Sequence, residues 1–433
     1  MKKDGLSIDE ILRLSNFWDK QPRAGFKRED YLLDLIRHLN SRVIKVLIGQ
    51  RRSGKSYVMR QLISYLLEEK KVPPKNILYL DFENQFLYSI TKAPQLHKLI
   101  QRYLSHHYTG GKFYLFLDEI QEVAGWEKIL TAYLGDSAYD LDIFITGSNS
   151  KLLSSELATY LTGRYIEKEI FPFSFTEYCD SRQLPCDRPH MMNYLQDSGI
   201  PELLNFQDKE LKASYLSALK DSIVMKDVVR RFSVKNPQVL ESIFHFLSDN
   251  IGNLFSITSI VNKLRNIGVN TNAMTLMHYI ACLEAAYLAF GISRYDLKGK
   301  KILEGEKKYY LTDLGFRNYF ISSFDPGLNK NLENYVFLML KLNGFSVYVG
   351  RIQDAEIDFV AEKQSEKLYV QVAFTLIDTK TLAREYGSLE NVRDNWKKIV
   401  VSLDEVQLPS RNGISHIRAW EFEAYLKTLF NRG

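Results

Sequence analysis

The feature that most constrains the fold is a glycine-rich turn between an apolar run and a helical segment. Residues 43–48, VIKVLI, are mostly β-branched and apolar, and the segment that starts at Tyr57, YVMRQLISYLL, has helical periodicity. Between them lies GQRRSGKS, residues 49–56, which satisfies the pattern G-x-x-x-x-G-K-[ST]. In this strand-to-helix setting the pattern predicts a phosphate-binding loop at the amino end of a helix.

The residues around this turn alternate between short apolar β-rich runs and helical stretches. From residue 43 to about 170 the runs are VIKVLIG, NILYLDF, FYLFLDE, LDIFITG and YIEKEIF. Such alternation predicts a parallel sheet with helices on both faces. We therefore expect an α/β fold here, preceded by a charged helical lead-in.

The rest of the chain divides into three further segments. Residues 171–240 are helical with several early prolines, and residues 241–322 read as helices followed by a basic hairpin. Residues 323–433 follow the order helix, three strands, helix, two strands and helix. We find no internal repeat, low-complexity tract or long linker, so we expect the segments to pack directly on one another.

The composition favours a soluble, cytoplasmic protein of several domains. The chain has 433 residues, 45% apolar and 25% charged, with a net charge of +5, which permits a nucleic-acid partner without requiring one. Three cysteines are too few for a disulfide framework, and the charged N-terminus lacks the apolar core of a signal peptide. The one membrane-like run, residues 274–292, contains His278 and Glu284 and predicts a buried helix, so we expect no membrane partner.

The glycine-rich turn is expected to bind the phosphates of ATP. Gly49 and Gly54 let the backbone curl so that its N–H groups face phosphate, and Lys55 reaches the β- and γ-phosphates. Ser56 offers its hydroxyl to Mg²⁺. The predicted cofactor-binding residues are Gly49, Arg52, Ser53, Gly54, Lys55, Ser56, Tyr57 and Asp118.

A second motif, FYLFLDEIQ, agrees with this prediction. An apolar strand ends in Asp118 and Glu119, where it meets solvent beside the nucleotide. We expect Asp118 to hold the Mg²⁺ shell with Ser56, and Glu119 to polarise the attacking water. The fourth strand ends in Ser148 and Asn149, polar groups able to orient that water or contact the γ-phosphate. Together the motifs predict an ATP-hydrolysing enzyme with Mg²⁺ as cofactor.

These motifs, with others further along, resemble those of a large group of predicted bacterial and archaeal AAA+ ATPases, in which a P-loop module precedes a C-terminal domain of unknown function. The matching text is IGQRRSGKS, FLDEIQEVAGWE, ITGSNSKLLSSELATYLTGRY, IFPFSFTEY, SGIPELL, IVMKDVVRRF, KYYLTDLGFRNYF, LENYVFLML and EIDFVAEK. The resemblance spans nearly the whole chain. It implies an α/β architecture with a lead-in at 1–42, an AAA+ P-loop core at 43–170, a helical lid at 171–240, a winged helix at 241–322 and a restriction-endonuclease-like domain at 323–433.

The resemblance also suggests that subunits act together. Arg164 in LTGRY stands just before the fifth strand, the topological position of the arginine finger in AAA+ ATPases. Such a finger acts on a neighbouring subunit's nucleotide and is worth about 10³–10⁵ in rate, which implies a homo-oligomeric ring, with a hexamer as one candidate. The alternative is a cap at the end of a helix. Arg230 and Arg231 are candidates for a second phosphate sensor, or for an ordinary solvated or acid-paired pair.

The middle segment resembles a winged helix. SITSIVNKLRNIG and NTNAMTLMHYIACLEAAYLAF give helix, turn, helix, and a two-stranded hairpin with Gly299 at its turn follows. The second helix, expected at 273–290, carries no Lys or Arg, which argues against sequence-specific DNA binding. The hairpin is basic, and its side chains either contact phosphates or form a solvated surface. Its basic residues are Arg294, Lys298, Lys300, Lys301, Lys307 and Lys308, with Lys298, Lys300 and Lys301 as the predicted DNA contacts.

The tail resembles the core of the PD-(D/E)xK nuclease superfamily, to which Holliday-junction resolvases belong. Glu333 would be its first acidic ligand and Asp358 its second. On the next strand Gln371 and Ala373 stand where such a nuclease needs a carboxylate and a lysine. Because Mg²⁺ prefers carboxylate oxygens and Ala373 cannot orient a water, we expect a degenerate site that does not cleave DNA. Such a domain would serve either to bind DNA or as an oligomerisation surface.

These observations predict an oligomeric AAA+ ATPase that couples ATP hydrolysis to DNA binding and remodelling or translocation. Branched, Holliday-type junctions are the most specific candidate substrate, which would place the protein in DNA repair. One alternative is a protein-directed ATPase or switch without DNA activity. Another is an active ATP-dependent nuclease.

Overall fold

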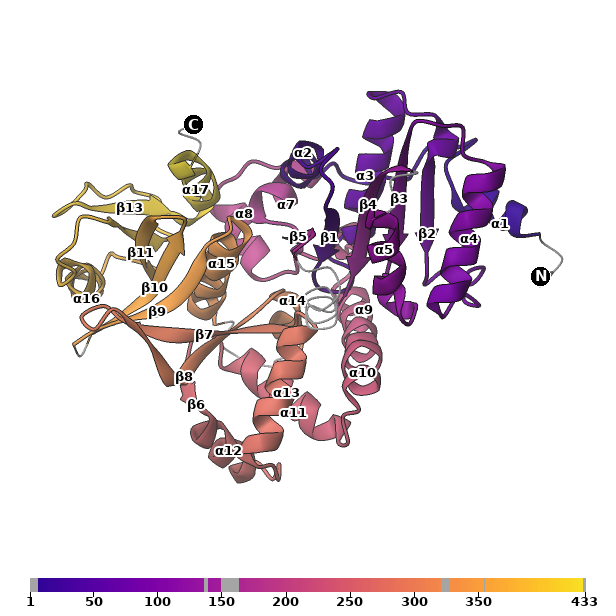
Figure 1. Cartoon of the computed structure of the whole chain (residues 1–433). Helices are drawn as coiled ribbons and strands as arrows, with labels where there is room; N and C mark the ends of the chain where they lie inside the picture. The colour runs from indigo at the N-terminus through magenta and orange to yellow at the C-terminus, as the bar shows by residue number, and fades with distance from the viewer. Residues whose placement is uncertain (1–6, 136–138, 149–162, 321–326, 354, 431–433) are drawn as a thin grey trace. The chain divides into compact units, whose positions relative to one another are not determined.

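The computed structural model describes residues 7–135, 139–148, 163–320, 327–353 and 355–430. The chain divides into two compact units, Met1–Ile170 and Phe171–Gly433, and each is described by itself. Figure 1 shows the elements of both units.

The first unit is built on a five-stranded parallel sheet of order β2-β3-β4-β1-β5. The expected α/β fold with a parallel sheet is confirmed. Leu62 of α3 packs with Tyr114 and Phe116 on one face, while Tyr103 of α4 contacts Phe113 on the other. The elements are α1 (Ile8–Ser15), α2 (Glu29–Arg37), β1 (Ile44–Ile48), α3 (Lys55–Glu68), β2 (Ile77–Asp81), α4 (Ala93–His106), β3 (Lys112–Asp118), α5 (Trp126–Gly135), β4 (Asp140–Gly147) and β5 (Tyr165–Glu169).

The register of this sheet places the carboxyl ends of four strands at one edge. Asp81 pairs with Asp118, and Ile48 pairs with Gly147, the last residues of their strands. Because the strands are parallel, the glycine-rich turn after β1 and the carboxylates after β3 meet at the same edge.

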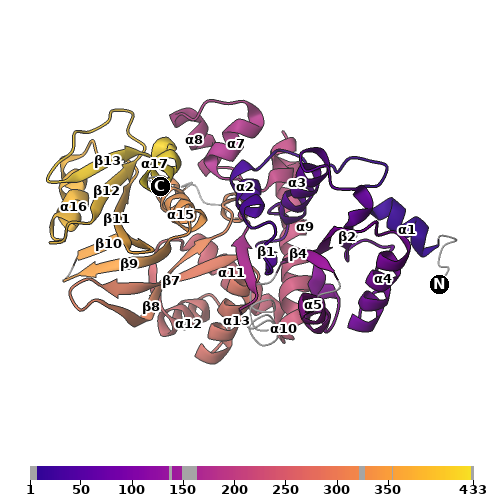
Figure 2. The same cartoon turned by 45° about the horizontal axis from the view of Figure 1, so that its top comes forward.

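The second unit contains a mixed sheet of order β13-β12-β11-β10-β9-β7-β8-β6. Helices α15 and α16 lie on opposite sides of β11, as Figures 1 and 2 show. Its helices are α7 (Phe175–Arg182), α8 (Arg188–Leu195), α9 (Lys209–Ser222), α10 (Arg230–Phe232), α11 (Pro237–Asp249), α12 (Ile257–Asn266), α13 (Ala273–Ala285), α14 (Gly315–Asn318), α15 (Leu328–Leu342), α16 (Thr379–Glu390) and α17 (Phe422–Phe430), with a π-helix at Ile223–Val229. Its strands are β6 (Leu254–Ser256), β7 (Ala289–Asp296), β8 (Lys301–Leu311), β9 (Ser346–Ile352), β10 (Ala355–Lys363), β11 (Glu366–Ala373), β12 (Lys397–Ser402) and β13 (Ile414–Arg418).

One sheet crosses the expected boundary between the middle segment and the tail. The hairpin β7–β8 joins the tail through parallel pairing of β7 with β9, in which Arg294–Asp296 lie beside Val349–Arg351. The buried apolar cluster of this unit also runs continuously from Phe171 to Leu426. The segments predicted as lid, winged helix and tail therefore share one core, and their division into separate domains stays a prediction.

The second helix of the helix-turn-helix is shorter than expected. It ends at Ala285 rather than 290, and Tyr287 has a φ of 55°, which turns the chain into β7. The prediction was wrong because an apolar run such as residues 285–292 cannot be assigned to buried helix or buried strand by periodicity. Among the described residues, no helix has both the length and the apolar character needed to cross a membrane.

Candidate nucleotide site and carboxylate site

The glycine-rich turn has a backbone that requires glycine at both ends. Gly49 has a φ of 142°, and a Cβ placed there would lie 2.3 Å from the carbonyl oxygen of Ile170. Gly54 has a φ of 102° and precedes α3 without a side-chain cap. The first N–H groups of α3 are therefore left for a ligand, and helix amino ends of this kind favour anions.

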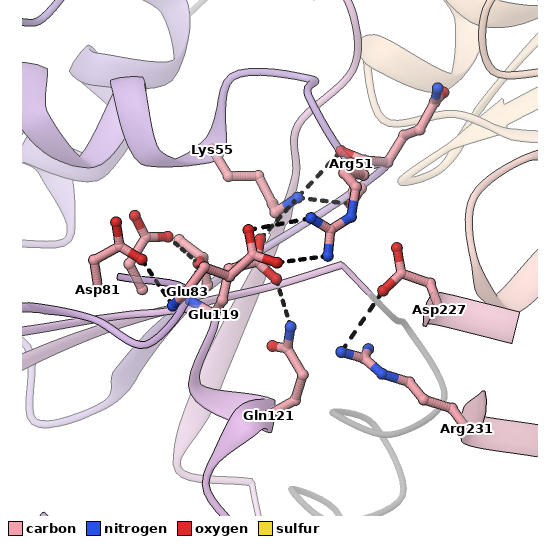
Figure 3. A network of polar contacts seen from close by, with 12 residues as sticks. Arg51, Lys55, Asp81, Glu83, Glu119, Gln121, Asp227 and Arg231 are labelled. Carbon is pink, nitrogen blue, oxygen red and sulfur yellow. Dashed lines mark hydrogen bonds and ion pairs between the residues drawn. The ribbon is translucent and has the colours of Figure 1, made fainter. Parts of the chain in front are cut away.

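Lys55 points into this turn rather than into solvent. Its Nζ donates to the carbonyl oxygens of Gly49 and Gln50, each at 3.1 Å, and lies 3.6 Å from Oε1 of Glu119 (Figure 3). The side chain is only 3% exposed, so these groups provide its charge compensation. A phosphate group would offer stronger, charged acceptors to the same ammonium.

Asp118 is buried and held by three hydroxyl groups. Tyr79 donates to Oδ2 at 2.6 Å and Thr146 donates to Oδ1 at 2.5 Å, while Ser56 hydrogen-bonds the same carboxyl. Burial, followed by the neighbouring Glu119, raises the pKa of Asp118 despite these bonds. The Ser56 hydroxyl beside this carboxylate is the oxygen-donor set that Mg²⁺ prefers, so these residues fit the ion.

Glu119 stands in a left-handed backbone conformation, with φ 53° and ψ 47°. Its N–H donates to the hydroxyl of Thr146 at 2.8 Å, which stabilises this turn. Its carboxylate accepts a short hydrogen bond from Gln121 and faces Lys55. Thr146 and Gln121 were not singled out from the sequence. Both were within the motifs that were quoted. Gln121 stands two residues after Glu119 in the same motif, whereas only the fold brings Thr146 of β4 to Glu119.

Two further acidic residues lie at the end of β2. Burial, followed by Asp118, raises the pKa of Asp81 to about 6. Glu83 forms a two-point ion pair with Arg51, at 2.7 and 3.1 Å (Figure 3). The sequence had suggested Arg52 as the nucleotide contact. Arg52 is exposed with a φ of 67°, while Arg51 links the glycine-rich turn to β2.

The lead-in contributes to the site, which the sequence did not predict. Arg28 donates to the carbonyl oxygen of Ser53 at 3.0 Å, and its own N–H donates to Oε1 of Gln61 in α3. Arg28 is fully buried, so it acts as a fixed support beneath the turn. Tyr57, another predicted contact, is half-exposed and lies under the guanidinium of Arg60.

Arg164 lies at the opposite edge of the sheet from Lys55. Its carbonyl oxygen accepts from the N–H of Ile44, the first residue of β1, whereas the glycine-rich turn follows Ile48 at the other end. Four residues of strand span about 13 Å. Arg164 is exposed at this far edge. Asn149, predicted to orient the water, lies outside the described residues, while Ser148 is buried at the end of β4.

The candidate sensor arginines belong to the second unit. Arg231 lies 3.7 Å from Asp227 one helical turn earlier, an arrangement that matches the acid-paired alternative (Figure 3). Arg230 is exposed. A role for either residue at the nucleotide stays a prediction.

The second unit holds a separate carboxylate site, formed by the tail. Glu333 of α15 and Asp358 of β10 both contact Nζ of Lys308, at 3.0 and 3.5 Å. The Oδ2 atom of Asp358 accepts from the N–H of Val372 at 2.9 Å. Burial, followed by Glu333, raises the pKa of Asp358 well above its usual value. The structure thus brings together the predicted Glu333, Asp358 and Gln371, through contacts that the sequence did not reveal.

Gln371 uses both ends of its amide in this site. Its Oε1 accepts from the N–H of Asp358 at 3.1 Å, and its Nε2 donates to Oε2 of buried Glu385 at 2.7 Å. A glutamate at this position would place two carboxylates against each other. Ala373 is buried among apolar side chains on the same face. The departure from the nuclease pattern therefore has a structural reason.

The hairpin is less basic on its surface than its sequence suggests. Lys298, Lys300 and Lys301 are exposed near its turn, and Arg294 pairs with Glu306 at 2.7 Å. The inclusion of Lys308 among the phosphate-contacting residues was wrong. Its side chain is 4% exposed and is directed into the carboxylate site, because strand alternation places it on the covered face of β8.

Comparisons with known proteins give a family model for most of the first unit and relatives that match most of the chain. A family model described as an AAA domain matches residues 41–179, and one described as a domain of unknown function matches residues 188–327. An uncharacterized protein of Haemophilus influenzae is 38% identical over 88% of this chain and 94% of its own length. An uncharacterized protein of Methanocaldococcus jannaschii is 32% identical over 84% of this chain and 81% of its own. The solved Walker-type ATPase of Pyrococcus abyssi has a TM-score of 0.48 at 18% identity, over 70% of this chain and 99% of that one.

Proposed function

The chain belongs to one family with these Haemophilus influenzae and Methanocaldococcus jannaschii proteins and carries an AAA-type ATPase module, and we propose that it hydrolyses ATP as an oligomer. The observation that carries the proposal is the convergence of Lys55, Asp118 and Glu119 at one edge of the parallel sheet. They supply a phosphate-binding ammonium, a magnesium-binding carboxylate and a second carboxylate for water, which phosphoryl transfer requires.

Binding of ATP would replace the internal contacts of Lys55. Its ammonium would leave the carbonyl oxygens of Gly49 and Gln50 for phosphate oxygens, while the free N–H groups of α3 bind the same phosphates. Ser56 and Asp118 would hold Mg²⁺, which neutralises charge on the phosphates when bound.

Glu119 would act on the attacking water. As the water oxygen attacks the γ-phosphorus, its proton passes to the Glu119 carboxylate and ADP departs. Thr146 holds the backbone of Glu119 through its N–H, and Gln121 and Lys55 contact its carboxylate. Departure of Lys55 to phosphate would also remove one of the contacts on the Glu119 carboxylate.

The oligomeric part of the proposal rests on Arg164. Since it lies at the edge of the sheet away from the glycine-rich turn, it is poorly placed to reach the nucleotide of its own chain. An exposed arginine at that edge is available to a second copy, where its charge would stabilise the transition state.

Mixing two inactive variants tests this arrangement. Lys55→Ala should abolish nucleotide binding, and Arg164→Ala should bind ATP but hydrolyse it slowly. A one-to-one mixture should recover about a quarter of wild-type turnover, because one interface in four then joins an intact P-loop to an intact arginine. Light scattering shows whether the two variants co-assemble. A co-assembled mixture that stays inactive would contradict the proposal that Arg164 of one subunit acts on the nucleotide of its neighbour.

We also propose that the ATPase acts on DNA by contacting the phosphates of the DNA backbone. The support is the group of exposed lysines at the hairpin turn, which suits phosphate contacts. ATP turnover should be measured without DNA, with linear duplex and with a four-way junction, using Lys55→Ala as the blank. Stimulation by the junction that falls with added salt is expected; turnover unchanged by every nucleic acid would contradict the DNA role.

One observation favours the protein-directed alternative. Ile267, Met274 and Met277 of the helix-turn-helix are 68%, 78% and 51% exposed, although apolar. Exposed apolar groups of this kind are typical of protein-binding surfaces, and methionine adapts to varied partners. If DNA has no effect, a polypeptide partner at this surface becomes the leading explanation.

A further inference from the structure

The carboxylate site of the second unit already contains a positive charge, the ammonium group of Lys308. Nζ of Lys308 lies 3.0 Å from Glu333, 2.8 Å from Glu356 and 3.5 Å from Asp358. An ammonium has three N–H donors, so one carboxylate is available to each. Burial alone would lower the pKa of Lys308, but Glu333, Asp358 and Glu356 together raise it above its usual value.

The order of strands in the sheet does not by itself predict that Lys308 of β8 contacts Asp358 of β10. Strands β8 and β10 are separated by β7 and β9, which in a flat sheet would place them about 14 Å apart. However, β7 pairs with β9 only through Arg294–Asp296, and the pairing of β10 with β9 is shifted between Ile357 and Val360. The pairing across these strands is therefore short and irregular, and Nζ of Lys308 reaches both Glu333 of α15 and Asp358 of β10.

The carboxylates are held from the other sides as well. Tyr310 donates to Glu333 at 2.6 Å, and a Cβ at Gly252 would lie 2.7 Å from its Oε2 atom. Asp358 accepts from the N–H of Val372. Among the residues that the structure describes, no group of three or more His, Cys, Asp or Glu is arranged to hold a metal ion. The carboxylates are spaced around an ammonium instead.

We propose that Lys308 is the resident cation of this site and takes the place of a divalent metal ion among Glu333, Glu356 and Asp358. The wild-type site then binds neither Mg²⁺ nor Mn²⁺, and removal of the ammonium lets the three carboxylates move together around a divalent cation. This inference is independent of the ATPase proposal, because it concerns residues of the second unit alone.

Titration of full-length, nucleotide-free protein with Mn²⁺ tests the proposal, read by isothermal calorimetry and by the spin-resonance signal of free Mn²⁺. Lys308→Met keeps the length of the side chain without its charge. It should bind one Mn²⁺ per chain, on the order of tenfold or more tighter than wild type, and Lys308→Met with Glu333→Gln should lose that binding. Lys308→Arg, which keeps the positive charge, is the matched control and should behave as wild type.

Circular dichroism of each variant shows whether it folds. If Lys308→Met does not fold, the wild-type protein still decides the matter: its Mn²⁺ isotherm should be unchanged by Glu333→Gln. A wild-type Mn²⁺ site that Glu333→Gln removes would overturn the proposal, because metal and ammonium would then occupy the site together. A folded Lys308→Met variant with no gain in Mn²⁺ binding would overturn it equally.

Discussion

Thr146 offers a sharp test of how the nucleotide site is organised, because its one hydroxyl bonds both the carboxylate of Asp118 and the backbone N–H of Glu119. It donates to Asp118 at 2.5 Å and accepts from the N–H of Glu119 at 2.8 Å. Thr146 is fully buried, so water cannot replace either bond. Thr146→Val keeps the shape of the side chain and removes both interactions.

The cost follows from these contacts. A buried N–H without a partner costs about 1–3 kcal/mol, and a hydrogen bond to a charged group contributes about 1.5–3 kcal/mol. Since one hydroxyl makes both bonds, we expect a combined loss of about 2–4 kcal/mol. A left-handed non-glycine residue such as Glu119 is also disfavoured by about 1–2 kcal/mol, so its backbone should relax and move the carboxylate. If half of the loss reaches the transition state, turnover falls by about 5–30-fold.

The assay is steady-state phosphate release at saturating ATP, with nucleotide affinity measured separately by a fluorescent analogue. Thr146→Val should lower kcat while ATP affinity changes little, because Lys55 and the N–H groups of α3 are untouched. Thr146→Ser, which keeps the hydroxyl, should stay close to wild type. The reasoning would be refuted by a folded Thr146→Val protein that hydrolyses ATP as fast as Thr146→Ser.

Three other changes give distinct outcomes. Asp81→Asn should raise the melting temperature of the nucleotide-free protein near pH 7.5 and change it little near pH 4. The reason is that burial and Asp118 raise the pKa of Asp81 to about 6, so the folded state binds this proton more tightly than the unfolded chain does. The ionised carboxyl therefore lowers stability above pH 6 and ceases to do so as the pH falls. Equal shifts at both pH values would contradict this assignment. Gly49→Ala should abolish binding of a fluorescent ATP analogue, since its Cβ would lie 2.3 Å from the Ile170 carbonyl oxygen; retained affinity would show that the turn can rearrange. The three exposed hairpin lysines, Lys298, Lys300 and Lys301, can be replaced together with Glu. This should weaken DNA binding in fluorescence anisotropy and reduce the slope of log affinity against log salt concentration by about 2–3. Unchanged affinity would show that the hairpin does not contact DNA.

The sequence was sufficient for the parts of the nucleotide site that depend on local chain geometry. Gly49, Gly54 and Lys55 form a fixed pattern between a strand and a helix, so their arrangement follows from the turn itself. Asp118 and Glu119 end an apolar strand, and parallel pairing brings that end to the same edge. The fold class was predictable because the alternation of strands and helices is also a local feature of the sequence.

The residues that the sequence did not reveal act across long stretches of chain. Arg28 supports the glycine-rich turn from the lead-in, and Thr146 reaches Glu119 from the neighbouring strand. Neither belongs to a motif with a fixed spacing to its partner. Their roles depend on strand order and helix docking, which hydrophobic periodicity does not specify.

Lys308 shows the same limit in the second unit. In the sequence it is one of several basic residues in a hairpin, and composition suggests a solvated or phosphate-binding surface. In the folded chain its side chain instead contacts Glu333 of α15 and Asp358 of β10, which belong to elements far along the sequence. Gln371 is similar, because its amide is explained by Glu385, which lies on a different element.

The central claim is that Glu119 drives ATP hydrolysis at a site built around Lys55. The most direct measurement compares phosphate release and ATP binding for wild type and Glu119→Gln. We expect the variant to bind Mg²⁺-ATP about as tightly as wild type, since the phosphate contacts remain, but to lose at least about 100-fold in turnover, as expected for loss of a general base. Turnover that survives in Glu119→Gln, or a wild-type protein that binds ATP without hydrolysing it under any condition tested, would contradict the claim.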